Sequence, residues 1–518
     1  MTSVGKKLVK LPITTRNIEA LGAAGNPPTD APDWIWDVDH PYLHGIFAPI
    51  KTEMSVDTLE VEGEIPYDLV GAYVRNGPNQ RFKPETRYHY YDGDGMLHAI
   101  YFREGKASYV SRWIHTFAFR REAEEGRNIW PGLSGPFNFS LPHSPIKDNS
   151  NTDVIFYNGK LLSLWYLAGV PYEIDPLTLK TRGAEDFGGK LRHTLSAHSK
   201  TDPRTGELIM FNYGNEAPYM TYGVGSPTGE LVHEVPIDIP GPRSPHDIGM
   251  TENHSILHDL PFFQDVDLLD TANKRQVRFH PDLPARFGVI PRYGRKDEVR
   301  WFEADSCYVL HIVNCWEDGD WIVMDGCRQP NPGYERDPAN EGLASMLSLR
   351  QRTHMLHRWR FNLKTGETRE HCIDDLNTEF PTINPLYAGL RSRYCYNQFI
   401  PPMDRTPGSV TGRCQTFDGL VKYDTETGSY EHWDYGENCY GNEAPFAPKV
   451  GATANDQEDD GYVVTFVTDT STWQSECHLF DAQNLSDGPI ARIKIPQRIP
   501  MGFHTTWMRG EDLGWVRP

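Results

Sequence analysis

At 518 residues the chain is long enough for several ordinary domains or for one large closed architecture. Its 45 glycines, 40 prolines and 38% apolar residues are typical of a loop-rich globular protein and argue against a disordered one. The formal charge of −20 argues against a nucleic-acid partner, because no cationic surface is available to replace phosphate counterions.

The eight cysteines are scattered through the second half of the chain without a C-x-x-C spacing, which argues against a zinc site or a disulfide framework. No run of about 18 apolar residues occurs, so we expect no membrane span. Residues 1 to 15 lack the long apolar core of a secretory signal. We therefore expect a cytoplasmic protein, and peripheral membrane contact stays open.

Residues 1 to 45 are irregular and rich in Gly, Pro and Asp, and we expect them to form an arm packed on the outside of the body. Residues 46 to 518 are expected to form a single domain. From Leu59 onward, short β-prone runs alternate with turns about every 8 to 12 residues, which predicts an all-β barrel, sandwich or propeller. The segments from about 255 to 290 and from about 335 to 360 are expected to be helical or irregular loops that cover one end.

One turn recurs in a loose form, each time after one strand-like run and before another. Similar hairpins spread along an all-β chain predict radial repetition, and hence a β-propeller. Trp-Asp pairs occur only twice and without a regular period, so a WD40 scaffold is a poor match. The recurring turns are Asp202-Pro-Arg-Thr-Gly206, Ser226-Pro-Thr-Gly229, Asn362-Leu-Lys-Thr-Gly366 and Asp424-Thr-Glu-Thr-Gly428.

A β-hairpin is predicted between Trp301 and Asp325, because two β-branched and aromatic runs flank the turn-forming Asp318-Gly319. His311 stands in the middle of the first strand, on the same face as Val309 and Val313. A buried imidazole needs a partner, which can be a carbonyl, a carboxylate or a metal ion.

Four of the 20 histidines lie far apart in the chain, each in a small-residue or apolar setting. Each inner strand of a propeller can present one side chain to the axis, so this spacing fits one metal ion held there. The pairs His254/His258 and His193/His198 are competing metal-binding candidates that lack an evident third ligand. The four histidines are His198, His246, His311 and His504.

Several short motifs occur one after another along the chain between about Leu59 and Trp507. They are Val74-Arg-Asn-Gly-Pro-Asn79, Tyr91-Asp-Gly-Asp-Gly-Met-Leu-His98, Ser111-Arg-Trp-Ile-His-Thr116, Gly169-Val-Pro-Tyr-Glu-Ile-Asp175, Glu379-Phe-Pro381, Phe417-Asp-Gly-Leu-Val-Lys-Tyr-Asp424 and Asn442-Glu-Ala-Pro-Phe-Ala-Pro448. With these motifs and the histidine segments, the chain resembles the carotenoid cleavage oxygenase family, which includes enzymes of the lignostilbene and isoeugenol type. Asp92-Gly-Asp-Gly95 could in isolation suggest a calcium loop, but it lacks the later Glu ligand and is better interpreted as a hairpin turn.

The resemblance implies a seven-bladed β-propeller with a dome of loops and helices, and one non-haem Fe(II) per chain on its axis. Family members support ligand histidines through glutamates that accept the outward N–H, and Glu379 and Glu443 match two of the three. Thr152 matches a position that borders an open site on the iron. Carried over by position, the iron ligands are His198, His246, His311 and His504.

The third supporting glutamate is not matched, because alignment on Gly169-x-Pro-Tyr172 places Leu167 there. Either one histidine uses a carbonyl or water instead, or a local insertion moves another residue into place. Tyr166 stands where phenol-cleaving members have a lysine, and Phe119 stands near a tyrosine position, which favours an apolar or differently anchored substrate. The candidates for lining an apolar tunnel are Phe82, Phe119, Trp165, Tyr166 and Leu167.

Four neutral imidazoles suit Fe(II) and leave open positions on it. The expected reaction is O₂-dependent cleavage of a conjugated C=C bond to two carbonyl products, which requires no external reductant. In agreement, we find no nucleotide-binding motif and expect no nucleotide cosubstrate. The substrate, an apolar conjugated small molecule, is either an apocarotenoid or a stilbene or phenylpropene. The alternatives are an iron-dependent isomerase or isomerohydrolase of the same fold, and a non-catalytic propeller that binds partners.

Overall fold

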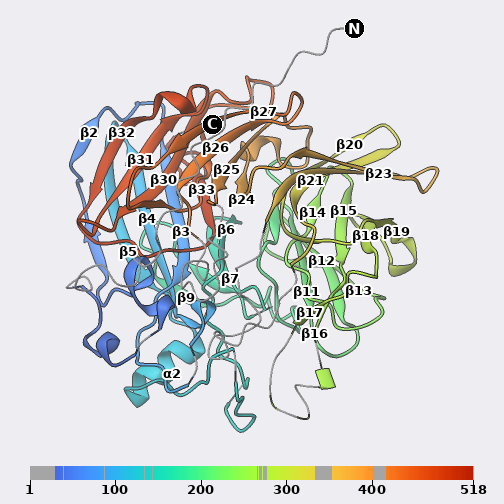
Figure 1. Cartoon of the computed structure of the whole chain (residues 1–518), viewed down its shortest axis with the longest axis horizontal. Coiled ribbons are helices and arrows are strands. Elements are labelled where there is room, and N and C mark those ends of the chain that lie inside the picture. The colour runs from blue at the N-terminus through green and yellow to red at the C-terminus, as the bar shows by residue number, and fades with distance from the viewer. Residues whose placement is uncertain are drawn as a thin grey trace.

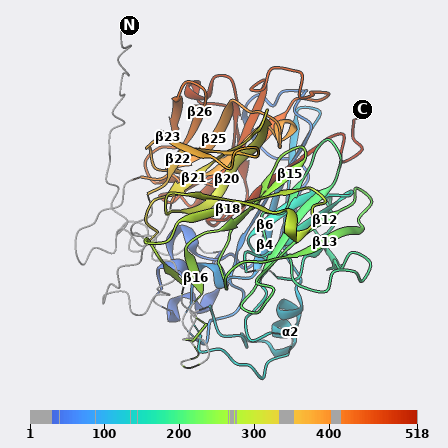
Figure 2. The same ribbon diagram turned by 90° about the vertical axis from the view of Figure 1, so that its right-hand side faces the viewer.

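The computed structural model describes residues 30–516 except 39, 87, 134, 143, 168, 265, 268–270, 272, 274–276, 333–352 and 402–415. Its strands form seven antiparallel sheets arranged radially around one axis (Figures 1 and 2). The predicted seven-bladed β-propeller is therefore confirmed. A separate two-stranded sheet joins β16 (Phe262–Gln264) to β17 (Val277–Phe279).

Both ends of the described chain complete sheets that belong to distant parts of the sequence. The first blade has the order β1 (Met54–Val56), β5 (Lys106–Trp113), β4 (Gly95–Arg103), β3 (Gly71–Pro78) and β33 (Thr505–Arg509). The last has the order β2 (Val61–Gly63), β32 (Pro489–Ile495), β31 (Gln474–Asp481), β30 (Gly461–Asp469) and β28 (Cys439–Gly441), with β29 (Phe446–Pro448) also paired to β30. Tyr73 of the first blade packs on Phe466 of the last, with ring centroids 4.6 Å apart. An apolar core therefore lies across the junction.

The five intervening blades each have four strands in chain order, apart from the inserted β16–β17 hairpin. The second blade contains β6 (Asp153–Tyr157), β7 (Lys160–Leu164), β8 (Tyr172–Ile174) and β9 (Thr181–Ala184), and the third β10 (Lys200–Thr201), β11 (Leu208–Tyr213), β12 (Met220–Gly225) and β13 (Leu231–Ile237). The fourth contains β14 (Gly249–Met250), β15 (His254–Asp259), β18 (Ala285–Pro291) and β19 (Arg300–Ala304). The fifth contains β20 (Tyr308–Asp318), β21 (Trp321–Gln329), β22 (Met355–Asn362) and β23 (Thr368–Asp374), and the sixth β24 (Thr378–Thr382), β25 (Tyr394–Phe399), β26 (Gly419–Asp424) and β27 (Ser429–Asp434).

The hairpin predicted around Asp318-Gly319 is present as β20 and β21, in which Asp318 pairs with Trp321. Gly319 has a φ of +62°, a conformation that glycine adopts without strain. Trp301 instead belongs to β19 of the preceding blade. The β20–β21 register shifts on both sides of Ile312, beside His311, and such irregularities re-aim side chains out of the regular alternation.

The prediction of helical or irregular loops between 255 and 290 is wrong, since this segment contributes β15, β16, β17 and β18. In β15 the buried Leu257 and Ile256 face opposite sides, so a strand buried on both faces lacks the alternation that would have revealed it. Of the segment from 335 to 360, residues up to 352 lie outside the described part, and Met355 begins β22.

Helix α2 (Phe117–Glu125) and the short 3-10 helices of the N-terminal part lie on one side of the blades, where they form the dome (Figure 1). Within the described ranges, none of the helices is long and apolar enough to cross a membrane. The 3-10 helices are η1 (Asp33–Asp37), η2 (Pro41–Leu43), η3 (Gly45–Phe47), η4 (Tyr90–Asp92), η5 (Lys296–Glu298), η9 (Pro385–Tyr387) and η10 (Leu485–Asp487).

A buried ion cluster holds the dome to the first blade. The Lys147 ammonium lies 2.6 Å from Asp94 Oδ1 and 2.8 Å from Glu122 Oε2, and all three side chains are at least 95% buried. Burial alone would lower the pKa of Lys147, but the two carboxylates outweigh burial and raise it to about 12. Asp94 belongs to the Asp92-Gly-Asp-Gly95 turn, so this acidic motif serves an ion cluster within the fold.

Lys147→Met is expected to lower the free energy of unfolding by about 3–5 kcal/mol, because it leaves two buried carboxylates without their cation. Urea unfolding followed by tryptophan fluorescence measures the change. Lys83→Met is the matched control, since Lys83 contacts Asp37 at 3.0 Å while both side chains are about half exposed. It should cost less than about 1 kcal/mol. Equal effects of the two substitutions would contradict the cluster's role.

Candidate metal centre

Each blade contributes one or two residues of the candidate site. These residues lie at or beside the innermost strand of the blade, close to the propeller axis. Neighbouring innermost strands contact one another around that axis, as β33 does β6 and β14 does β20. The side chains therefore converge although they lie far apart in the sequence. In blade order the contributions are His504 before β33, Thr152 and Asp153 at β6, His198 before β10, His246 before β14, His311 in β20, Glu379 in β24 and Glu443 between β28 and β29.

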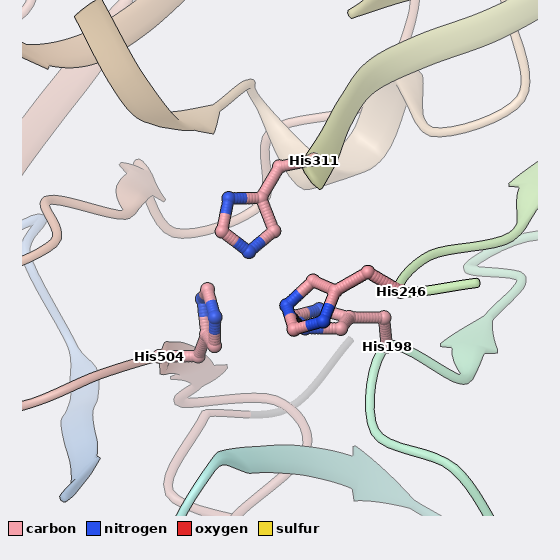
Figure 3. Close-up of side chains that lie close together, drawn as sticks. All are labelled: His198, His246, His311 and His504. Atoms are coloured by element: carbon pink, nitrogen blue, oxygen red, sulfur yellow. Dashed lines mark hydrogen bonds between the residues drawn. The ribbon is translucent and has the colours of Figure 1, made fainter. Parts of the chain in front are cut away.

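The four predicted histidines meet at one point (Figure 3). One ring nitrogen from each lies within 4.8 Å of the corresponding nitrogens of the other three. The Nε2 atoms of His198 and His246 are 3.1 Å apart. All four side chains are at least 90% buried. The structure thus brings together all the residues that the resemblance names as ligands.

This arrangement fits a single metal ion. Two imidazole nitrogens bonded to one ion at about 2.1 Å and at right angles would be about 3 Å apart, which matches the separation of His198 and His246. Imidazole suits Fe, Cu, Ni and Zn, whereas Ca²⁺ and Mg²⁺ prefer oxygen. The donor set therefore selects a transition metal.

Glu379 and Glu443 orient two of the histidines from behind. Glu379 Oε2 lies 2.5 Å from His311 Nδ1, and Glu443 Oε1 lies 3.0 Å from His504 Nδ1. The other oxygen of Glu443 accepts the backbone N–H and the hydroxyl of Thr505. A carboxylate on Nδ1 fixes the tautomer and leaves Nε2 to face the centre.

The start of β6 connects two other ligand segments. Asp153 Oδ2 accepts the backbone N–H of His198 at 2.9 Å, and the Thr152 carbonyl accepts the backbone N–H of His504 at 3.1 Å. His198 has a φ of +65°, a left-handed conformation that residues other than glycine seldom adopt. The bond to Asp153 helps to hold that strained backbone in place, as is common at functional sites.

The electrostatic environment differs between the histidines. Burial lowers the pKa of His198 well below its usual value, and the other three imidazoles lower it further, so His198 is neutral near pH 7. Burial also acts to lower the pKa of His504, but the carboxylates of Glu443, Asp153 and Glu379 outweigh it and raise that pKa. His504 is therefore the ligand at which protons compete with a metal ion.

Two cavities reach the cluster from different sides. An aromatic cavity of about 40 Å³ is bordered by His246, and a larger one of about 560 Å³ is bordered by His198. His311 and His504 border both. The larger cavity, which we call the axial channel, extends to exposed turns such as Asn158. The histidine cluster thus lies between an aromatic compartment without aspartate, glutamate, lysine or arginine in its described lining and one that also contains charged side chains such as Asp153, Lys200 and Asp247.

The aromatic cavity has a lining that was only partly anticipated. Tyr166 lines it, with its ring 6.1 Å from that of His246, and so does Thr152. Sequence reasoning missed other lining residues. Some of them are chain neighbours of His311, Glu379 and His504, and that adjacency was the available signal. The missed residues are Tyr42, Phe47, Tyr90, Tyr91, Leu310, Phe380, Phe417, Met501, Gly502 and Phe503.

The other candidates for the substrate tunnel lie outside this lining. Phe119, on α2, packs with Trp113 and stacks on His115, and Phe82 lies beside the Arg81 guanidinium. The Trp165 carbonyl accepts the N–H of Ala197, next to His198. Leu167 packs against the apolar cluster that contains Trp165. Roles in substrate binding for these residues, and for Tyr166, stay predictions, as does the role of Thr152 at an open metal position.

The competing histidine pairs do not form comparable groups in the described part of the chain. His254 Nδ1 lies 3.0 Å from Glu317, and His193 Nε2 lies 2.8 Å from Glu234. His258 packs edge-on against Phe287. Tyr42 belongs to the predicted N-terminal arm but lines the aromatic cavity, while the boundary at residue 45 stays a prediction.

The class of this protein is that of seven-bladed β-propellers with four buried histidines that converge on the axis in an arrangement suited to a metal ion. Residues 47–509 match the model of a family described as retinal pigment epithelial membrane protein. The chain belongs to this family, that of the carotenoid cleavage oxygenases, and it is an enzyme of the carotenoid-cleavage dioxygenase type. The resemblance seen in its motifs is thereby confirmed.

Individual relatives cover nearly the whole chain. Carotenoid 9,10(9',10')-cleavage dioxygenase 1 of Pisum sativum is 36% identical over 92% of this chain and 91% of its own length. Isoeugenol monooxygenase of Pseudomonas nitroreducens is 29% identical over 90% of this chain and 98% of its own. The crystal structure of Pseudomonas brassicacearum lignostilbene dioxygenase superposes with a TM-score of 0.79 at 29% identity, and covers 91% of this chain and 99% of that one.

Replacing His311 or His504 by Ala should weaken binding of Co²⁺, a spectroscopic substitute for Fe(II), by at least about tenfold. Each substitution removes one of four converging nitrogens. Titration followed by visible absorption measures the affinity. His258→Ala is the control, because His258 is equally buried but lies outside the cluster. Wild-type affinity in either ligand variant would contradict the four-histidine centre.

Metal binding should release more protons at about pH 6 than at about pH 8.5, because the raised pKa of His504 leaves it protonated at the lower pH and only neutral imidazole binds a metal. Affinity should fall as the pH falls through that pKa. Calorimetric titration with Co²⁺ in buffers of different ionisation enthalpy counts the protons. Equal release at the two pH values would be the contrary result.

Proposed function

We propose that the four histidines hold one Fe(II) and that the protein uses O₂ to cleave a C=C bond of an apolar conjugated substrate into two carbonyl products. The observation that carries this proposal is the convergence of His198, His246, His311 and His504 beside an aromatic cavity. Bound iron supplies the electrons that let O₂ react with an alkene. Each oxygen atom ends in one carbonyl, so the reaction needs no reductant and no nucleotide cosubstrate.

The protein's own part is to position and shield the reacting groups. Glu379 and Glu443 fix the orientation of His311 and His504, and the Thr152 carbonyl holds the backbone of His504. The four ligands are neutral, so the ion keeps its full double charge. The aromatic rings exclude water from the side on which an alkene would lie.

The lining of the aromatic cavity favours a flat conjugated substrate. Its described residues include eight tyrosine and phenylalanine rings but no lysine, arginine, aspartate or glutamate. Offset and edge-on contacts between rings and a conjugated chain suit such a surface. At about 40 Å³ the cavity holds only a few waters, so entry of a larger substrate requires lining side chains to move.

Two substrate classes follow from the relatives. The 36% identity to the pea enzyme supports a carotenoid or apocarotenoid, and the 29% identities to the isoeugenol and lignostilbene enzymes support a propenylphenol or stilbene. We favour the carotenoid class, because Tyr166 and Phe119 stand where the lysine and the tyrosine of phenol-cleaving members are expected. Cytoplasmic localisation stays a prediction.

Incubation with ¹⁸O₂ should place label in both carbonyl products, one atom in each. Mass spectrometry on a panel of carotenoids, apocarotenals, stilbenes and propenylphenols identifies the substrate and the cleaved bond. Rapid trapping of the aldehydes, for example by reduction to alcohols, limits exchange of the label with water. Product without label would favour the isomerase or isomerohydrolase alternative, and absence of turnover by iron-loaded protein would favour a binding propeller.

A further inference from the structure

We propose that Asp247 is a positioning residue that joins three of the four histidine segments into one unit. Asp247 is 98% buried and directly follows His246 in the sequence. This inference rests on the proposed metal site.

Each contact of Asp247 reaches a different ligand segment. Oδ2 accepts the backbone N–H of Ile312 at 2.7 Å, directly after His311. Oδ1 lies 2.7 Å from the Lys200 ammonium, two residues after His198. The same oxygen accepts the N–H of Ile248 at 2.7 Å, which fixes the backbone on the far side of Asp247 from His246. One carboxylate therefore links the third, fourth and fifth blades.

These contacts occur where regular β-sheet hydrogen bonds do not fix the backbone of His198, His246 and His311. His198 precedes the two-residue β10, and His246 lies outside the short β14. His311 lies beside the register shifts of β20, and Ile312 donates its N–H to Asp247 at that irregular position. Ladder hydrogen bonds alone therefore do not set the three backbones relative to one another.

The energetic argument follows from burial. A buried carboxylate is costly unless it is paired and hydrogen-bonded, and Asp247 has two N–H donors and one ammonium. Removing it leaves the Ile312 N–H and the Lys200 charge without that acceptor, so the segments carrying His311 and His198 can relax independently. Glu379 and Glu443 contact the rings of His311 and His504, whereas Asp247 contacts backbone groups and a lysine and no ring of the cluster among those described.

The test compares Asp247→Ala and Asp247→Asn with Asp325→Asn. Asp325 is a matched control because it is 99% buried and pairs with Arg358 at 2.6 Å, yet it has no contact with a histidine of the cluster among those described. Co²⁺ affinity and the visible absorption spectrum of the bound ion are measured on folded protein, with thermal unfolding followed separately. The spectrum reports ligand geometry, which a merely structural loss of stability would not change.

Asp247→Ala should weaken Co²⁺ binding by about 10- to 100-fold and alter the spectrum, because supporting residues of metal sites contribute effects of this size. Asp247→Asn retains an acceptor oxygen and should fall between Asp247→Ala and wild type. Asp325→Asn should lower stability but preserve affinity and spectrum. If Asp247→Ala does not fold, the same measurements are made on Asp247→Asn and Lys200→Met. Both variants are expected to bind Co²⁺ more weakly than wild type and to show an altered spectrum.

Wild-type affinity and spectrum in the folded Asp247 variants would overturn the inference. So would an equal spectral change in Asp325→Asn, since it would show a general effect of buried charge removal. Failure of the wild-type protein to bind Co²⁺ at all would instead overturn the proposed metal site, so the two failures are distinguishable.

Discussion

The structure depends on the closure of the propeller ring by both ends of the described chain. β33 completes the first blade beside β3, and β2 joins the last blade beside β32. The apolar core across this junction, with Tyr73 packed on Phe466, makes the closure part of the hydrophobic interior. Without it the innermost strands would not share an axis, and His504 would not reach the other histidines.

Closure also explains how a metal centre can be assembled from residues more than 300 positions apart. The centre contains no local motif of the kind found in zinc fingers. Its geometry is held by carboxylates that cross between blades, from Glu443 to His504 and from Glu379 to His311. The strained backbone of His198 fits this picture, since the surrounding structure must compensate its cost.

The sequence allowed prediction of the β-propeller from recurring turns, and of the hairpin around Asp318-Gly319 from its flanking runs. The histidines were distinguished only by their settings, and the family resemblance was needed to choose among 20 of them. Strands buried on both faces, such as β15, were missed because their residues do not alternate. Asp247 carries no recognisable pattern of its own, since its contacts are with segments that only the closed fold brings near.

His311 and His504 border both the aromatic cavity and the axial channel, while His246 and His198 each border one. Two ligands can therefore approach the same centre through separate cavities. An inhibitor in the channel and an apolar aromatic one in the cavity would be able to bind at once. Their joint inhibition would then be additive in free energy or cooperative, and it would not show the mutual exclusion of two competitors for one pocket.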